Sequence, residues 1–175
     1  HGNADGTSDN RSWNCGWEGD AGVPDDVLVI RTRQMRNSFS LTMPSNAARM
    51  TAAGDEFANS QQGNNNAYNQ DNPTGWLDWA HADRELMAFV QSVLLLRRAE
   101  PALRHSRWFA HSPAPAGERS VVWLAPTGQS MQVHDWHDAA QHAFACRIDA
   151  APKSATDVVH PNSIGCQHLL IAFNP

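Results

Sequence analysis

The segment 83–100 constrains the fold most, because it carries the apolar spacing of an amphipathic helix. Its apolar residues recur at intervals of three and four: Leu86, Phe89, Val90, Val93 and Leu94. This spacing places them on one face of an α-helix. Asp83 has the side-chain oxygen that an N-cap needs, and Pro101 stands just beyond the last turn. The sequence therefore predicts a helix over 83–100 with one buried face.

A second helix is predicted over 24–43. Pro24 is favoured in a first helical turn, and Asp25 and Asp26 beside it suit the positive end of the helix dipole. A core stripe follows at spacings of seven and four: Leu28, Met35 and Phe39. Pro44 cannot continue the helix and should end it. Two amphipathic helices thus frame the first part of the chain.

The composition changes after about residue 105. Short apolar runs separated by turn residues follow, at 121–124, 131–133, 143–148 and 169–173. Such runs are typical of β-strands in a sheet domain. A further apolar run at 50–53 is compatible with a short buried strand, and the Gly/Asn/Asp/Ser-rich residues 1–23 predict loop.

Between the two helices lies a segment rich in side-chain amides. From Asn59 to Asn72, nine of fourteen residues are Asn or Gln. Such side chains offer donors and acceptors together, which matches sugar hydroxyls. They also close Asx-turns on their own backbone, and amide-rich tracts can be low-complexity sequence. Residue types alone leave a ligand-binding loop and a self-bonded structural loop both open.

Carboxylates and aromatic rings border this amide-rich segment. Asp55 and Glu56 precede it, and adjacent residues on a strand point to opposite faces, so they cannot form a facing catalytic pair. Either they contact a substrate or they cap the loop. Trp76 and Trp79 follow the segment, and they either stack on sugar faces or anchor the loop to a core.

Charge and composition exclude several classes of function. The net charge is −5, which gives no electrostatic footprint for nucleic acid. No apolar run approaches the length that spans a bilayer, and the N-terminal residues have no apolar leader. Three widely spaced cysteines favour free thiols in a reducing compartment. We therefore expect a cytoplasmic protein with neither a membrane nor a nucleic-acid partner.

The histidines His134, His137 and His142 invite a metal interpretation. A zinc site needs ligands in tetrahedral array, and neither a CxxC nor an HExxH pattern is present. A polar turn is the alternative interpretation, and no phosphate loop or dinucleotide fingerprint occurs. We expect no metal and no cofactor.

A resemblance to a known family rests on motifs in order and spacing along most of the chain. They are DGTSDN at 5–10, SWNCG at 12–16, RQMRN at 33–37, AGDEF at 53–57, QGNNNAY at 62–68, QDN at 70–72, WLDW at 76–79, LRR at 96–98, PAL at 101–103, WL at 123–124 and DW at 135–136. Together they resemble bacterial glycogen debranching enzymes, which are isoamylase-type members of the α-amylase superfamily. The stretch 45–52 departs from the family's pattern, because Arg49 and Thr51 stand where its eighth strand is apolar.

The resemblance implies a fold class, α/β plus β. Residues 1–105 would be the C-terminal end of a (β/α)8 TIM barrel, with its last two helices, its eighth strand and the loop after that strand. Residues 106–175 would be part of a C-terminal all-β sandwich domain. Loops that follow barrel strands build the active-site face, so the amide-rich segment would lie there. Exposed barrel faces would also favour self-association.

The resemblance also implies a function. The parent reaction would be hydrolysis of α-1,6-glucosidic branches in glycogen or limit dextrin by a retaining two-carboxylate mechanism. The family's catalytic carboxylates lie upstream of the matching segment, so we expect no catalytic residue and no turnover in this chain alone. Residues expected to contact an α-glucan or maltooligosaccharide are Asp55, Glu56, Asn64, Asn65, Asn66, Tyr68, Asp71 and Trp76. The alternatives are a non-catalytic glucan-binding or interaction protein and a decayed remnant.

Overall fold

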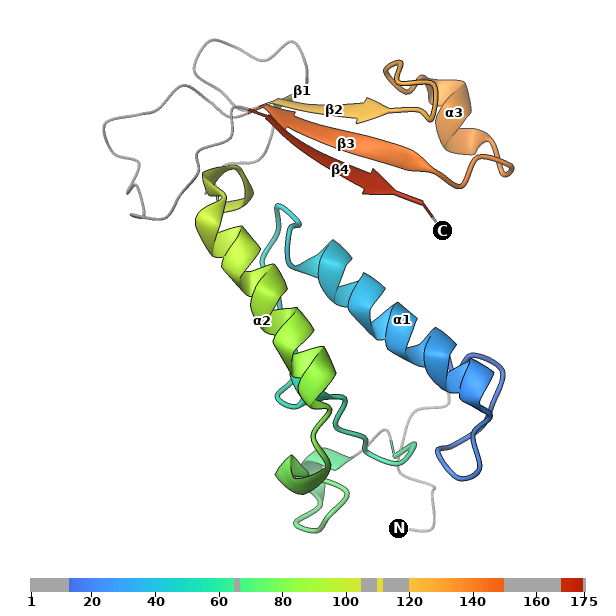
Figure 1. Cartoon of the computed structure of the whole chain (residues 1–175), viewed down its shortest axis with the longest axis vertical. Helices are drawn as coiled ribbons and strands as arrows, with labels where there is room; N and C mark the ends of the chain where they lie inside the picture. Colours follow the sequence, from blue (N-terminus) through green and yellow to red (C-terminus); the bar gives the residue numbers. More distant parts are fainter. Residues whose placement is uncertain (1–12, 65–66, 105–109, 112–119, 150–167, 175) are drawn as a thin grey trace. The chain divides into compact units, whose positions relative to one another are not determined.

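The computed structural model describes residues 13–64, 67–104, 110–111, 120–149 and 168–174 (Figure 1). The chain divides into two compact units, His1–Leu94 and Leu95–Pro175. The first is helical and the second carries a sheet. The predicted N-terminal loop is confirmed for residues 13–23, and residues 1–12 lie outside the described part.

Helix α1 spans Asp25–Thr42, as the sequence predicts. Pro24 is the N-cap in an extended conformation, and Asp25 and Asp26 occupy the first turn, where negative charge suits the helix dipole. The backbone N–H of Met43 closes the last turn on the carbonyl of Phe39 at 3.0 Å. The helix ends at Thr42, and a turn follows at Met43 and Pro44.

Helix α2 spans Arg84–Ala99, and the predicted cap is present. Asp83 Oδ1 accepts a hydrogen bond from the backbone N–H of Leu86 at 2.9 Å. Leu86 and Val90 are buried, which confirms the central part of the predicted stripe. Leu94 is 46% exposed, so the stripe does not stay buried to the last turn.

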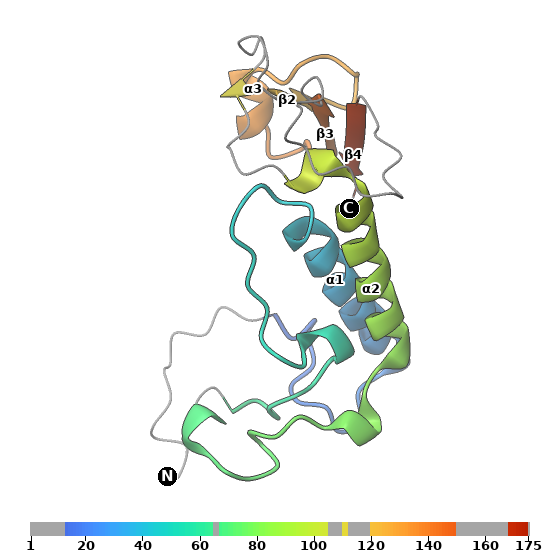
Figure 2. The same ribbon diagram turned by 90° about the vertical axis from the view of Figure 1, so that its left-hand side faces the viewer.

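The two helices run side by side in both views (Figures 1 and 2). Their shared core consists of four buried side chains, with three partly buried ones around them: Phe39, Met43, Leu86 and Val90, then Met35, Phe89 and Val93. Burying one such side chain contributes roughly 1.5–3 kcal/mol. This core joins the two helices that flank the amide-rich segment in the chain.

The short buried strand predicted at 50–53 is wrong. The described residues of this unit contain no strand, and Met50 is 88% exposed. A strand needs a neighbour to satisfy its backbone groups, and none lies beside this segment in the described part of the unit. Thr51 and three small residues also bury too little apolar surface to hold the segment inside.

The second unit contains a four-stranded sheet in the order β1-β2-β3-β4. The strands are Ala110–His111, Ser120–Leu124, Phe144–Asp149 and His168–Phe173. The last three are antiparallel neighbours, and β1 is a two-residue parallel strand beside β2. Three of the four predicted strands are thereby confirmed.

The sheet packs on the short 3-10 helix Pro101–Arg104. Ala102 and Leu103 from that turn form a buried cluster with Cys146 and Ile148 of β3. Alternate residues of β3 face this cluster, as the two-residue period of a strand requires. Pro101 thus ends α2 and also begins the segment that covers one face of the sheet.

The strand predicted at 131–133 is wrong. Val133 instead begins a short helix, α3, which spans Val133–His137. Gln132 and Asp135 form a reciprocal capping box, in which Asp135 Oδ2 accepts from the backbone N–H of Gln132 at 2.7 Å. This local hydrogen bonding stabilises a helical turn, and it outweighs the weak strand preference of three apolar residues.

Candidate functional site

A tight turn begins the amide-rich segment. Gly54 is left-handed, with φ of 101°, and its carbonyl accepts from the backbone N–H of Asn59 at 2.9 Å. A Cβ at position 54 would lie 2.6 Å from Asn59 Cβ and 3.0 Å from Leu77 Cδ2. Only glycine combines this backbone angle with this close approach. The turn brings the chain directly into the 3-10 helix Asp55–Phe57.

The acidic pair caps this turn. Asp55 Oδ2 accepts from the backbone N–H of Ala52 at 2.8 Å, and Glu56 Oε2 accepts from that of Gly54 at 2.9 Å. Both carboxylates therefore have a structural role, which was one of the two interpretations of the sequence. Asp55 is exposed and Glu56 is half-buried, so only Asp55 presents most of its surface to solvent.

The side chains of Asn59 and Asn72 bond the loop's own backbone. Asn59 Oδ1 accepts from the backbone N–H of Asp78 at 2.9 Å, across nineteen residues. Asn72 Oδ1 accepts from the N–H of Thr74 at 2.9 Å, which is an Asx-turn. Asn64 is half-buried, and its N–H binds the carbonyl of Gln61 at 3.0 Å. The self-bonded interpretation therefore holds for the side chains of Asn59 and Asn72.

Aromatic side chains of the loop divide into an anchor and exposed rings. Phe57 is 2% exposed and contacts Trp79 with ring centroids 4.4 Å apart. Trp79 thus serves as an anchor, although half of its surface is exposed. Trp76 is 55% exposed, and its Nε1–H donates to Asp71 Oδ1 at 2.9 Å. Tyr68 is 89% exposed, and the predicted contact residues Asn65 and Asn66 lie outside the described residues.

Three loop segments meet around a polar cavity of about 620 Å³. We call it the loop pocket; its lining comes from residues 19–21, 57–62 and 73–81. Among the predicted contact residues that the structure describes, Trp76 alone is in its lining. Asp55, Glu56, Asn64, Tyr68 and Asp71 do not line it.

The polar side chains of the loop pocket are not among the individual contact residues predicted from the sequence. They include Asp20, Asn59, Asp78 and His81. The WLDW motif at 76–79 contained Asp78, so that residue could have been found. Asp20 lies in the N-terminal loop, and no sequence pattern connects it to the amide-rich segment.

Arg31 of α1 holds the N-terminal side of the pocket in place. Its guanidinium donates to the backbone carbonyls of Asn14, Trp17 and Gly19 at 2.6–3.2 Å. It also donates to Asp20 Oδ1 at 3.2 Å. Asp20 Oδ2 in turn accepts from Ser60 Oγ at 3.1 Å, forty residues along the chain. This network joins the N-terminal loop, α1 and the amide-rich segment.

The opposite side of the pocket carries an acid–imidazole pair. Asp78 Oδ2 lies 2.7 Å from His81 Nδ1, and Asp78 Oδ1 accepts from the backbone N–H of His81 at 3.2 Å. The side-chain hydrogen bond from His81 lowers the pKa of the Asp78 carboxyl below its ordinary value. Asp78 is therefore an anion throughout the neutral range.

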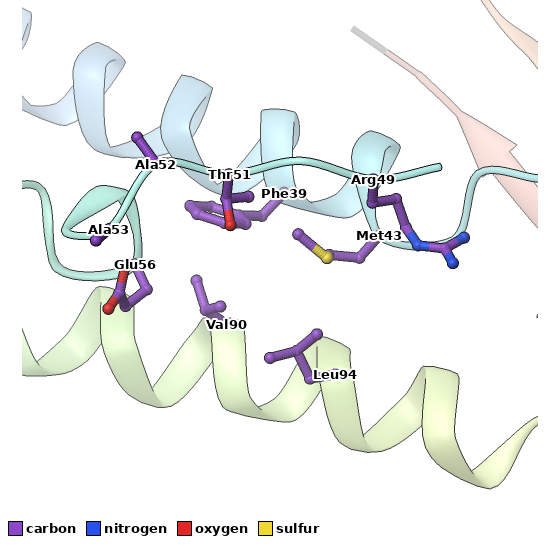
Figure 3. Close-up of a pocket in the computed structure, with 9 residues that line it drawn as sticks. All are labelled: Phe39, Met43, Arg49, Thr51, Ala52, Ala53, Glu56, Val90 and Leu94. Atoms are coloured by element: carbon purple, nitrogen blue, oxygen red, sulfur yellow. The ribbon is translucent and has the colours of Figure 1, made fainter. Parts of the chain in front are cut away.

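A second cavity of about 540 Å³ lies between α1, α2 and the segment 49–56 (Figure 3). Phe39, Met43, Val90 and Leu94 form its apolar part. The charged side chains of Glu56 and Arg49 lie at opposite ends of this cavity (Figure 3). Its lining is mostly apolar, with few groups that could orient a polar ligand. We therefore interpret this cavity as a gap in the packing between the two helices and the segment 49–56, and not as a site for a polar ligand.

The histidine-rich turn does not gather a metal site. His134 and His137 lie on α3, and His134 Nε2 is 3.4 Å from Asp135 Oδ1. Within the described ranges, no three His, Cys, Asp or Glu side chains come together in a way that could hold a metal ion. Nor does any helix in these ranges have the length and apolar character needed to cross a membrane.

Comparison with known proteins shows which proteins this chain is similar to. No protein-family model matches it. It is 39% identical over 159 residues to a Mycobacterium tuberculosis protein named glycogen operon protein GlgX homolog, a match that covers 89% of this chain and 22% of that protein. It is 44% identical over 146 residues to the glycogen debranching enzyme of Serratia proteamaculans, a match that covers 83% of this chain and 21% of that enzyme. It is also 42% identical over 135 residues to the glycogen debranching enzyme of Dickeya chrysanthemi, and this match covers 77% of the chain and 20% of the enzyme.

These identities relate the chain to glycoside hydrolases of the glycogen-debranching kind. More particularly, it is homologous over most of its length to a part of GlgX-type debranching enzymes. The chain spans about a fifth of the length of the curated relatives it matches. Its helices and antiparallel sheet are compatible with a portion of a larger glycoside hydrolase.

Proposed function

We propose that this chain forms part of the glucan-contacting region of a glycogen debranching enzyme. The parent reaction is the hydrolysis of α-1,6-glucosidic branches in glycogen or limit dextrin, by a retaining pair of carboxylates. The observation that carries this proposal is the 39–44% identity to GlgX-type proteins over most of the chain. The catalytic carboxylates belong to other parts of such an enzyme, and this segment shapes the site around the substrate.

The proposed architecture follows the same relationship. Residues 1–105 correspond to the end of a (β/α)8 barrel, and residues 106–175 to part of a β-sandwich. Two helices on either side of a long loop, followed by an antiparallel sheet, support this assignment. The segment 49–53 is the place of the eighth strand, and it would become a strand only with neighbouring strands to pair with.

The contact residues of this proposal lie on the loop between the helices. They are Asp55, Glu56, Asn64, Asn65, Asn66, Tyr68, Asp71 and Trp76. The exposure of Asp55, Tyr68 and Trp76 supports their part in it. Exposed aromatic rings suit the apolar faces of glucose units, while carboxylates and amides suit the hydroxyls.

A second candidate function is glucan binding without catalysis. The exposed ring of Trp76, held at its Nε1 by Asp71, favours it, because an oriented aromatic surface suits binding alone. The proposed partners are the same in both cases: glycogen, limit dextrin and maltooligosaccharides. The cytoplasm is the proposed location, and the free thiols of Cys15 and Cys146 support it.

Two measurements on the purified 175-residue chain test these proposals. Calorimetry with maltoheptaose should show binding, and incubation with a branched limit dextrin should release no maltooligosaccharide. Release of product by the chain alone would contradict the assignment of catalysis to other parts of the enzyme. Absence of any binding to maltoheptaose would contradict the glucan-contacting role.

A further inference from the structure

We propose that the loop pocket binds an uncharged glucose unit, with Asp20, Asp78 and His81 as its hydrogen-bonding residues and Trp76 as its stacking surface. This inference rests on the proposed function and names the subsite through which the chain would hold glucan. Three of these four residues lie outside the set that the sequence analysis singled out.

The size and make-up of the pocket suit a small ligand. Its volume of about 620 Å³ falls within the roughly 300–1,000 Å³ of typical ligand sites. Its lining combines apolar surface from Phe57, Leu77 and Trp76 with several polar side chains. A pyranose also has apolar faces and a polar edge, so it matches a lining of this kind.

The acid–imidazole pair is arranged in advance for sugar hydroxyls. Asp78 is fixed by three hydrogen bonds, one from its own N–H to Asn59 and two to its carboxylate from His81. A carboxylate can accept about four hydrogen bonds, so that of Asp78 retains capacity to accept from a ligand. The Asp78 side chain is 58% exposed and that of His81 is 84% exposed, so both are accessible.

Asp20 provides a similar acceptor from the N-terminal loop. Arg31 and Ser60 bind one carboxylate oxygen each, which fixes the orientation of the side chain. The Asp20 side chain is nevertheless 65% exposed. Fixing these groups in advance reduces the side-chain entropy lost when a ligand binds.

The charge of the pocket determines which sugars it accepts. Two carboxylates, Asp20 and Asp78, are in its lining, and the described lining residues include no lysine or arginine. The guanidinium of Arg31 is already bound to Asp20 and three backbone carbonyls. A uronic acid or a phosphorylated sugar would therefore meet like charge, whereas neutral glucose would not.

Trp76 provides the aromatic surface. Its indole N–H donates to Asp71, which orients the ring, and more than half of the residue remains exposed. Phe57 and Trp79 contact each other, whereas no ring contact of Trp76 is found in the described part of the chain. Its faces are therefore available to a sugar ring.

The test is a nitrogen-15 NMR titration of the 175-residue chain with maltotriose and, separately, with trigalacturonate. These probes have equal numbers of rings, and only the second is anionic. We expect maltotriose to shift the Trp76 indole signal and the backbone amides of Asp78 and His81. Trigalacturonate should leave these signals unchanged.

Three variants complete the titration. Trp76→Ala and Asp78→Asn should each weaken maltotriose binding about tenfold, which corresponds to about 1.4 kcal/mol. Trp13→Ala is the matched control, because Trp13 is an exposed tryptophan of the same unit outside the pocket, and its affinity should not change. A dispersed amide spectrum checks that each variant is folded. If Trp76→Ala does not fold, the Asp78→Asn variant and the comparison of maltotriose with trigalacturonate still test whether the loop pocket binds a neutral sugar.

The outcomes separate this inference from the proposed function. Shifts confined to residues 64–68, with none in the pocket, would overturn the pocket assignment and leave glucan contact intact. Equal shifts with the anionic trimer would overturn the charge selectivity. No shift anywhere with maltotriose would overturn the inference, and maltoheptaose calorimetry then decides separately whether the chain contacts glucan at all.

Discussion

Individual side chains in the amide-rich segment show how similar hydrogen-bond acceptors can serve two purposes. Asn59 and Asn72 bind backbone N–H groups of the loop itself. Asp71, in contrast, binds the indole of an exposed tryptophan. Asparagine and aspartate both carry a side-chain oxygen that accepts hydrogen bonds, so the residue type alone does not separate these three positions. Only the partner of each side chain distinguishes a residue that shapes the loop from one that orients a ligand-facing ring.

Cys146 allows a prediction about a single thiol. It is 6% exposed, and burial raises the pKa of its thiol to about 11. Because the thiolate is the reactive form, we expect iodoacetamide to alkylate Cys146 at least about tenfold more slowly than the partly exposed Cys15 near pH 8. Mass spectrometry of peptides after timed labelling measures both rates.

The control for this prediction is the unfolded chain. In guanidinium chloride the two cysteines should react at similar rates. The raised pKa also means that the folded state holds its proton more tightly than the unfolded state. The contribution of this thiol to stability is therefore complete below pH 9 and is lost as the pH rises to about 11. Equal native rates for both cysteines would contradict the burial of Cys146.

Among the elements, α2 depends most clearly on a local signal. Asp83 satisfies the backbone N–H of Leu86, and its own N–H donates to the carbonyl of Phe57 at 3.1 Å. It therefore joins the helix to the turn that begins the amide-rich segment. A substitution at position 83 removes only the side-chain hydrogen bond to Leu86, because the backbone hydrogen bond to Phe57 does not depend on the side chain.

Replacing Asp83 with alanine should lower the free energy of unfolding by about 1 kcal/mol, within the range of 0.5–2 kcal/mol known for N-caps. The physical reason is the loss of an acceptor for an N–H at the start of the helix. Asp83→Asn is the matched control, since asparagine caps equally well, and it should stay near the native value. Urea unfolding followed by circular dichroism measures both variants. Equal midpoints for alanine and native chains would show that the cap does not matter.

The two wrong strand predictions concern elements whose state depends on neighbours. The run at 50–53 lacks a partner strand in the described part of its unit, and the run at 131–133 meets a capping box at Gln132. A helix satisfies its backbone internally, so α1 and α2 could be predicted from spacing and caps. A strand satisfies its backbone only through other segments, and sequence patterns do not supply those.

At the scale of the whole molecule, several large apolar side chains are exposed on the two long helices. The exposed side chains include six aliphatic residues: Leu28, Val29, Leu41, Leu94, Leu95 and Leu96. Contiguous apolar patches on soluble proteins mark interaction surfaces or aggregation-prone regions. We propose that the chain self-associates through these faces, as expected for helices that would cover a barrel.

Sedimentation velocity tests this proposal over a range of protein concentrations. The weight-average sedimentation coefficient should rise with concentration, and Leu95→Glu should reduce the rise, because it places a charge on a residue that is 62% exposed. Gln91→Glu adds the same charge at an exposed polar position of the same helix and should have little effect. A coefficient independent of concentration for the native chain would contradict self-association.

The sequence by itself determined the helices, the loop between them, three strands and the relationship to debranching enzymes. These follow from local spacing, from caps such as Asp83, and from motifs such as QGNNNAY at 62–68, all of which lie within a few residues. It also singled out Trp76 beside that loop, and the structure then showed that more than half of this residue is exposed. Local signals of this kind do not depend on the rest of the fold.

The tertiary structure alone decided which residues form the loop pocket. Asp20, Ser60 and Asp78 are separated by many residues and share no pattern, and the guanidinium of Arg31 helps to bring their segments together. The structure also decided that Asp55 and Glu56 cap a turn, because the left-handed Gly54 directs the backbone N–H groups of Gly54 and Ala52 toward them. A side chain's role is set by the groups that surround it, and these come from distant parts of the chain.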